Sequence, residues 1–274
     1  MQINNDSLMN VAKDINIPEE FLNDVFKDLS FVNDEIIKLS LLLADSNEAN
    51  NAFSKLNDLL CKDDPKGYKI FYCYLLAISE SKKEYEKLGI DESIFFNTMK
   101  AFSRFLNESK EMYHEYRFDR SWWTYRQTSL RLFGFGEFEF EIVIEQPNLI
   151  SVHIPTGSSL DVKELFKEKK QFEKLMKKMY PNLLIEGYVM SSWLLSPQIK
   201  EILPKESKIY QFAKQFDIVN TYQENDILRW VYHIPNEDVD YSSLEEKTMI
   251  QRFIKIKLLN KEPILGGVGY LKER

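Results

Sequence analysis

The stretch Glu137-Phe-Glu-Phe-Glu-Ile-Val-Ile-Glu145 decides the fold class of this chain of 274 residues. Apolar residues occupy positions 138, 140, 142 and 144, and glutamates occupy most of the positions between them. An alternation with a period of two residues is typical of a half-buried β-strand. The pattern of the chain changes before this stretch, because the first 116 residues show no such alternation.

Those first 116 residues predict helices only. Apolar residues recur at helical spacing from Pro18 onward, and the sequence Pro65-Lys-Gly67 indicates a break followed by a new helix. Gly89 is suited to end a helix, and Asp91 is suited to cap the next one. About five amphipathic helices without a strand signal predict a helical bundle, with a domain boundary near residue 116.

The part after residue 136 predicts strands and helices in alternation. We expect a strand over 149–154, a helix over 162–180 and a strand over 183–195, with short helices beginning at Pro197 and Ser207. The same order of hairpin, His-Ile-Pro, helix and strand recurs, because His153-Ile-Pro155 is matched by His233-Ile-Pro235. A strand over 227–234 and a helix over 242–259 belong to this second half.

Together these patterns predict an α+β protein, in which an N-terminal helical bundle (1–116) precedes a mixed-sheet α/β domain (117–274). Because hairpins precede each long helix, a Rossmann unit is excluded. The repeated order suggests that 136–192 and 217–271 are similar halves. Chance identity of a few residues is the alternative.

Composition excludes several function classes. The chain has 14% aromatic residues, too many for a disordered protein, and a net charge of −7, which does not favour nucleic acid. We expect no membrane partner, since no apolar run approaches 20 residues. The two cysteines, Cys61 and Cys73, and the three histidines lack metal-site spacing, so no metal is expected. Two unpaired thiols and a start unlike a signal peptide predict a cytoplasmic protein.

Two groups of glycines match phosphate-binding motifs in letters only. Arg131-x-x-Gly134-x-Gly136 resembles a pyrophosphate-binding pattern, but that chemistry requires a helix to begin after the glycines. Here a strand follows, so we interpret Gly134 and Gly136 as turn or bulge glycines. No helix follows Gly266-Gly267-x-Gly269 either.

Several candidate site residues are charged or titratable, and the glutamates and histidines among them each have two interpretations. The row of glutamates at 137, 139, 141 and 145 is either a solvated strand face or a carboxylate wall facing a cationic amine. His153 and His233 are either strand-end histidines bonded to backbone or groups that titrate near physiological pH. Trp122 and Trp123 point to opposite sides, so one of them is interpreted as packing between the domains, with Arg126 stacked on one of the two.

Three segments carry a resemblance to a known family. They are Ser191-Ser-Trp-Leu-Leu-Ser-Pro197 with the following Leu203-Pro-Lys-Glu-Ser207, the segment Val152-His-Ile-Pro-x-Gly157, and Arg131-Leu-Phe-Gly-Phe-Gly-Glu-Phe-Glu-Phe140. With Phe212 and Phe216 they resemble a bacterial acyltransferase family that has an N-terminal helical domain and a GNAT-like C-terminal domain. Members of that family often carry a cysteine-histidine pair where this chain has Met190 and Ser191, so no histidine role is carried over to that position.

The resemblance implies transfer of an acetyl or other acyl group from acyl-CoA to an amine on a small molecule or peptide. The amine would attack the thioester directly, with a base to deprotonate it and an acid for the leaving thiolate. The candidate bases are His153, Glu139 and Glu141, and the candidate acids are Tyr188 and Tyr222. A catalytically inactive module that binds a ligand or partner is the alternative.

The resemblance also implies where acyl-CoA would bind. The pantetheine arm would pair with the strand over 186–192, at Met190, Ser191 and Ser192. The phosphates would lie at the following helix starts, near Gln198 and near Ser207 and Lys208. Gly187 within this strand predicts a bulge or a close approach of another backbone.

Overall fold

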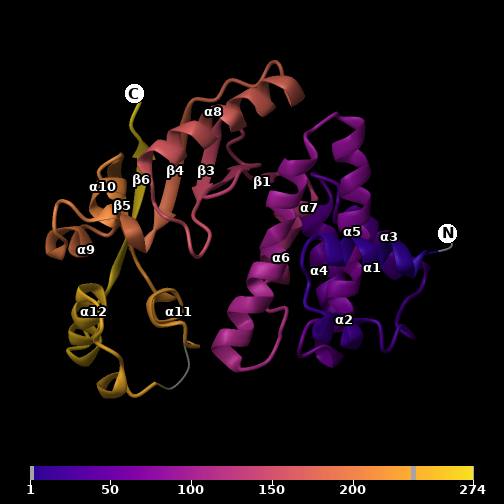
Figure 1. Cartoon of the computed structure of the whole chain (residues 1–274), viewed down its shortest axis with the longest axis horizontal. Helices are drawn as coiled ribbons and strands as arrows, with labels where there is room; N and C mark the ends of the chain where they lie inside the picture. The colour runs from indigo at the N-terminus through magenta and orange to yellow at the C-terminus, as the bar shows by residue number, and fades with distance from the viewer. Residues whose placement is uncertain (1–2, 236–238, 274) are drawn as a thin grey trace.

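The computed structural model describes residues 3–235 and 239–273, and it has a helical half and a half built on one sheet (Figure 1). The helices of the N-terminal half are α1 (Asn5–Asp14), α2 (Glu19–Val25), α3 (Asp34–Leu42), α4 (Ala49–Leu60), α5 (Tyr68–Lys87), α6 (Glu92–Tyr113) and α7 (Ser121–Thr128). The helices of the second half are α8 (Val162–Met179), α9 (Pro197–Ile202), α10 (Lys208–Ala213), α11 (Ile227–Tyr232) and α12 (Met249–Leu259). The strands are β1 (Leu132–Gly134), β2 (Glu139–Ile142), β3 (Leu149–His153), β4 (Gly187–Ser192), β5 (Phe216–Gln223) and β6 (Leu265–Leu271).

The helices begin where their capping residues predict. The Asp91 carboxylate accepts a hydrogen bond of 2.8 Å from the backbone N–H of Ser93 at the start of α6. Gly67 precedes α5 with φ of 75°, and a Cβ there would lie 2.6 Å from the backbone oxygen of Phe118. The predicted break at residues 65–67 is therefore confirmed, and only glycine fits its last position.

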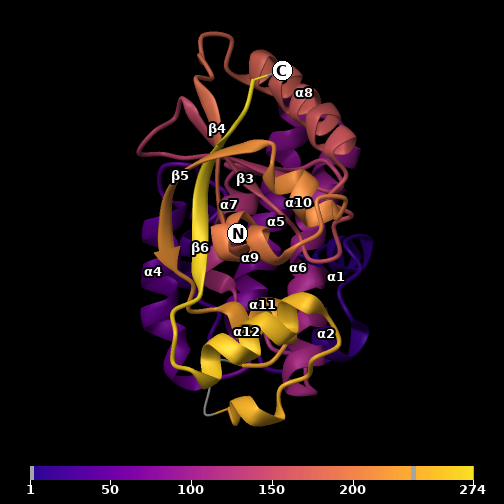
Figure 2. The ribbon, with the colours of Figure 1, turned by 90° about the vertical axis from the view of Figure 1, so that its left-hand side faces the viewer.

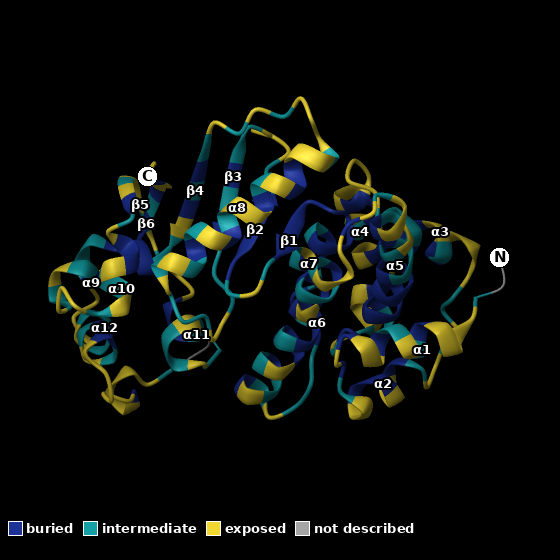
Figure 3. Ribbon diagram, turned by 45° about the horizontal axis from the view of Figure 1, so that its top comes forward, coloured by how far each residue is buried: buried dark blue, intermediate teal, exposed yellow. Residues whose placement is uncertain are grey.

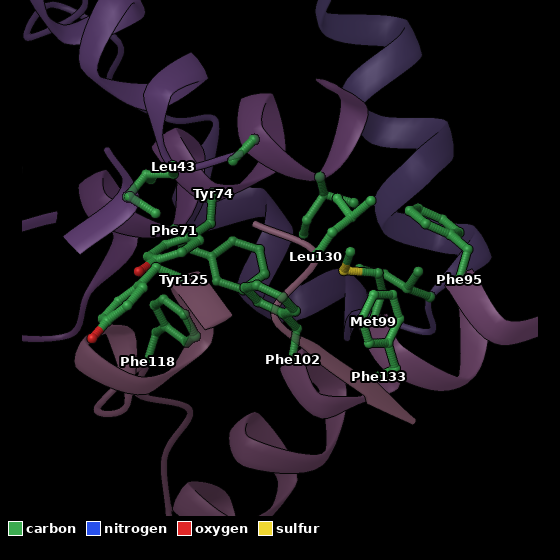
Figure 4. Close-up of a cluster of buried hydrophobic side chains, with 14 of the residues drawn as sticks. Leu43, Phe71, Tyr74, Phe95, Met99, Phe102, Phe118, Tyr125, Leu130 and Phe133 are labelled. Carbon is green, nitrogen blue, oxygen red and sulfur yellow. The ribbon is translucent and has the colours of Figure 1, made fainter. Parts of the chain in front are cut away.

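Aromatic rings fill the core of the helical half (Figure 4). Phe71 and Phe118 meet edge to face with ring centroids 4.9 Å apart, and Phe102 stacks on Phe118 at 5.7 Å. The same cluster of buried residues continues into the sheet through Phe133. Helical structure also continues past residue 116 into α7, so the boundary at residue 116 stays a prediction.

The sheet has the strand order β1-β2-β3-β4-β6-β5 among the described residues. β3 and β4 are parallel, and the other neighbouring pairs are antiparallel. Helix α8 connects the two parallel strands, as such a crossover requires. The predicted mixed sheet after the helical bundle is confirmed.

One face of the sheet is covered by α8 and α10. The ring of Phe172 in α8 stacks on Phe140 of β2 at 5.2 Å, and Phe212 of α10 stacks on Phe138 at 5.8 Å. The opposite face of β2 looks toward α6 and α7, from which Arg104 and Arg126 reach it. Figure 3 shows that β1 and β2, between these layers, are buried.

The prediction of two similar halves is wrong. Residues 227–232, predicted as part of a strand, form helix α11, so the second half has no hairpin before its helix. Ile227 and Leu228 are buried. Ile227 belongs to a small apolar cluster with Ile250 and Ile254, and Val231 and Tyr232 pack against that cluster. The spacing of residues 227, 228, 231 and 232 is that of a helix. His233 does not end a strand; it is exposed and ends α11 with φ of 54°. Figure 2 shows α11 and α12 below the sheet.

The glycines of the sheet serve packing. A Cβ at Gly134 would lie 2.8 Å from the backbone oxygen of Asn97 in α6, and one at Gly136 would lie 3.0 Å from the Glu168 carboxylate. The prediction of a bulge or a close backbone approach at Gly187 is wrong. Gly187 pairs regularly with Leu149, and a Cβ there would make only ordinary contacts with side chains. The register shift of the sheet lies instead in β5, between Ile218 and Asn220. Among the described residues, no helix is long and apolar enough to cross a membrane.

Candidate active site

The parallel strands β3 and β4 separate part-way along their length. Their ladder joins Leu149 to Gly187 and ends at the pair Ser151 and Val189. Beyond it β3 continues to His153 on the β2 side, and β4 continues to Ser192 on the β6 side. The strand edges past that last pair therefore face each other without a ladder, at the carboxyl ends of parallel strands where open sheets bind ligands.

His153 lies at this separation and is held by a carboxylate. Its ring atom Nε2 is 2.8 Å from Oε2 of Glu141, which lies on β2. The register places His153 directly opposite Glu139 and Ser151 opposite Glu141, so all four share one face of the sheet. When Nε2 carries the proton donated to Glu141, the free lone pair is on Nδ1.

Glu141 is a buried carboxylate surrounded by cations. The Nε of Arg126 is 3.0 Å from its Oε1, and an Nη of Arg131 is 3.5 Å from the same oxygen. Burial raises the pKa of the Glu141 carboxyl, but the hydrogen bond from His153 and the charges of His153 and the two arginines outweigh it and hold the pKa below its usual value. Glu141 therefore stays ionised and can orient the imidazole.

Trp123 of α7 completes the surroundings of the imidazole. Its ring meets the His153 ring edge to face, with centroids 4.9 Å apart. The Arg126 guanidinium lies 4.2 Å from the centre of the same tryptophan, which confirms the predicted stacking. Trp123 thus contacts both His153 and Arg126, whereas its neighbour Trp122 is exposed.

The glutamates predicted as a row are separated by the structure. Glu139 and Glu141 are buried, at 3% and 6% exposure, so a solvated face is the wrong interpretation for these two. Glu139 forms an ion pair of 2.7 Å with Arg104 of α6. Glu137 lies before β2, where it accepts from the backbone N–H of Ser159, and Glu145 is exposed in the turn after β2.

The two candidate acids lie on different faces of the sheet. Tyr188 points into the core under α8, where its hydroxyl donates to Glu173 at 3.1 Å and burial raises its pKa. The structure therefore does not bring Tyr188 together with His153. Tyr222 of β5 interacts with Ser191 and donates to Glu224 at 3.2 Å, and its pKa is raised chiefly by burial. Ser191 is exposed beside the separation.

The residues predicted to hold acyl-CoA have local partners. Ser192 and Ser207 cap the short helical segments that follow them, and Gln198 bonds the backbone at Pro263 and Leu265. Met190 is buried, and Lys208 is exposed. Their contact with acyl-CoA stays a prediction.

Family models match both halves of the chain. A model described as the GNAT-like C-terminal domain matches residues 85–271, and one described as the N-acyltransferase N-terminal domain matches residues 7–130. The chain belongs to the GNAT-like N-acyltransferases. The predicted family is thereby confirmed.

Solved structures of acyltransferases share the fold of this N-acyltransferase. A crystal structure of an acyltransferase in complex with decanoyl-CoA and teicoplanin is similar over 99% of this chain and 89% of that chain, with a TM-score of 0.80 and 14% identity. A complex with decanoyl-CoA alone covers 98% of this chain and 88% of the other, with a TM-score of 0.75 and 12% identity. No curated protein matches the chain in sequence.

Sequence reasoning missed the cationic side of the site of this N-acyltransferase. Arg104 and Arg131 carry no local signal, since each meets its glutamate only through the packing of α6 and of the segment before β1 against β2. The spacing of Trp123 and Arg126 on one helix was a usable signal, because residues three apart lie on the same helical face.

Proposed function

We propose that this protein transfers an acyl group from acyl-CoA to an amine on a small molecule or peptide. The observation that carries the proposal is the separation of β3 and β4 with the His153–Glu141 pair beside it. The backbone edges past Ser151 and Val189 can receive the amide groups of a pantetheine arm, since buried polar groups without partners are costly.

In this proposal His153 is the general base. Its Nδ1 accepts a proton from the amine as the amine nitrogen bonds to the thioester carbonyl carbon, and the carbon–sulfur bond then breaks. Glu141 stabilises the imidazolium that forms. Extending the register by two residues from the Ser151–Val189 pair brings His153 and Ser191 opposite each other across the separation on one face. The imidazole would thus come from β3, opposite the position of Ser191 on β4.

The leaving thiolate would take its proton from Tyr222. This hydroxyl lies beside Ser191, and its raised pKa keeps it protonated at neutral pH. We place the pantetheine arm along Met190, Ser191 and Ser192. Gln198, Ser207 and Lys208 remain the predicted phosphate contacts.

Solved relatives with decanoyl-CoA and with teicoplanin support a medium-length acyl donor and an acceptor larger than a simple amine. The decisive experiment follows CoA release from acetyl-CoA and decanoyl-CoA with a panel of amines, peptides and glycopeptides, together with calorimetry of CoA binding. Turnover that depends on an acceptor supports the proposal. Saturable CoA binding without turnover on any acceptor would favour the inactive binding module instead.

A further inference from the structure

Helix α8 covers one face of the sheet and carries none of the residues that we place in the reaction. Seven of its residues are lysine and three are glutamate, whereas the whole chain has a net charge of −7. Its buried side packs toward the sheet, and exposed positions recur along the helix (Figure 3). The outer side of α8 therefore carries a charge opposite to that of the molecule as a whole.

Five of these lysines form one row along the exposed side, which we call the lysine ridge: Lys163, Lys167, Lys170, Lys174 and Lys177. They recur every three or four residues, which is the spacing of one helical face, and all five are exposed. At about 1.5 Å per residue, the ridge is roughly 21 Å long. It presents a straight line of cations on the side of α8 that faces away from the sheet.

Most of the ridge has no counter-charge. Lys167 forms an ion pair of 2.7 Å with Glu164. The ammonium groups of the other four lysines make no hydrogen bond or ion pair with any residue that the structure describes. The remaining glutamates of α8 are engaged elsewhere, since Glu168 is buried and accepts two backbone N–H groups, and Glu173 pairs with Lys169, which lies off the ridge. An anionic surface would thus meet several uncompensated cations at once.

Apolar side chains are exposed where the ridge ends. Tyr180 directly follows α8 and is 41% exposed, and Leu184, four residues further on, is 70% exposed. A lipid interface gives such a leucine apolar surroundings, which a nucleic-acid backbone does not. A basic face next to exposed apolar and aromatic residues is typical of a protein surface that binds anionic lipid.

We infer that the lysine ridge binds the surface of a membrane that contains anionic lipids, and that Leu184 enters its interface. Each lysine near such a surface contributes about a fivefold factor in affinity. Our expectation of no membrane partner rested on the lack of a spanning segment, and binding at the surface needs none. The contact uses no residue of the proposed reaction, so it is independent of that reaction.

Co-sedimentation with vesicles tests this inference on the whole chain. Vesicles of phosphatidylglycerol and phosphatidylcholine in equal parts should bind the protein at low salt, and vesicles of phosphatidylcholine alone should bind it at least tenfold more weakly. Binding should be lost toward about 1 M salt, where the Debye length is about 3 Å. Equal binding to both kinds of vesicle would overturn the inference. Tighter binding to duplex DNA than to the anionic vesicles would also overturn it and would assign the ridge to nucleic acid.

Matched variants locate the contact. Lys170→Glu combined with Lys174→Glu should weaken binding to the anionic vesicles at least about twentyfold, because two lysines are lost. Lys55→Glu combined with Lys62→Glu is the control, since it changes the net charge equally at exposed positions of the helical half.

A second pair of variants tests the apolar contact. Leu184→Ser should weaken binding at least threefold, whereas Leu59→Ser, at a leucine that is 52% exposed on α4, should leave it unchanged. All these positions are exposed, so the thermal midpoint of each variant should match that of the parent. Equal losses within either pair would overturn the inference. The assay contains neither acyl-CoA nor acceptor, so a failure of the proposed reaction leaves it intact.

Discussion

The Nε2 atom of His153 lies 2.8 Å from Oε2 of Glu141, across two adjacent antiparallel strands. The contact runs diagonally, because the register sets His153 opposite Glu139 rather than Glu141. Glu139 is engaged by Arg104, which leaves Glu141 to hold the imidazole. The end of β3, where it separates from β4, therefore carries a histidine whose orientation is fixed by a carboxylate.

Replacing His153 should remove the base and leave acyl-CoA binding intact. Loss of a general base typically lowers the rate by about 100- to 10,000-fold. We therefore expect His153→Ala to reduce kcat by a factor in this range, while calorimetry finds a CoA affinity within about twofold of the parent. The control is His233→Ala, which alters an exposed histidine at the end of α11 and should keep full activity. Equal activity of the two variants would remove His153 from the mechanism.

Glu141→Gln should destabilise the protein in a pH-dependent way. The variant leaves Arg126 and Arg131 without their buried counter-charge, which typically costs about 3–5 kcal/mol. The lowered pKa of Glu141 means that its ionised form stabilises the fold above its usual pKa and that this stability is lost as the pH falls through the lowered value.

Urea unfolding at pH 7 and pH 3 checks this expectation. The difference between the parent and Glu141→Gln should be large at pH 7 and should shrink at pH 3, which lies below the usual pKa of a glutamate, because the unfolded parent then binds a proton more readily than the folded parent does. A difference that stays constant between the two pH values would mean that the charge of Glu141 does not stabilise the fold. Its loss should also shift the pH profile of turnover, since Glu141 positions His153.

Two strand glycines offer a matched pair for a packing prediction. A Cβ at Gly267 of β6 would overlap the carbonyl oxygen of Leu195, a backbone atom with little freedom to move. A Cβ at Gly187 of β4 would lie 3.6 Å from a methyl of Leu149, an ordinary contact. Gly267→Ala should therefore cost about 1–3 kcal/mol, as overpacking does, and Gly187→Ala should cost less than ~0.5 kcal/mol. Thermal unfolding measures both, and equal losses would contradict the prediction.

Local patterns predicted those parts of the fold that local interactions determine. The caps at Asp91 and Ser207 and the restart at Gly67 depend on neighbouring residues, and all three are found as predicted. The segment after Asp226 was predicted wrongly, because its apolar residues suit a strand as well as a helix. Packing of Ile227 against the small cluster around Ile254, a contact between distant residues, selects the helix.

The candidate site follows the same division. His153, Glu139 and Glu141 could be selected from the sequence, because one strand and the next histidine supply them. Their ion pairs with Arg104 and Arg126 could not be selected, since these arginines arrive from helices 35 and 15 residues earlier. Tyr188, a candidate acid, lies on the face of the sheet that meets α8, away from His153, because the alternation of a strand does not say which of its faces a helix covers.

A bulky side chain at the separation of β3 and β4 should block the acyl donor. Ser191 is exposed on β4, two residues past the last pair with β3, so Ser191→Trp places an indole where we locate the pantetheine arm without disturbing a buried residue. We expect CoA affinity to fall at least tenfold, with an unchanged thermal midpoint. Val219→Trp is the control, since Val219 is 59% exposed on β5, away from that separation, and should keep the parent affinity. Calorimetry of both variants distinguishes a local block from a general effect of an added indole. Parent-like affinity in a folded Ser191→Trp variant would place acyl-CoA elsewhere and remove the main physical argument for binding between these two strands.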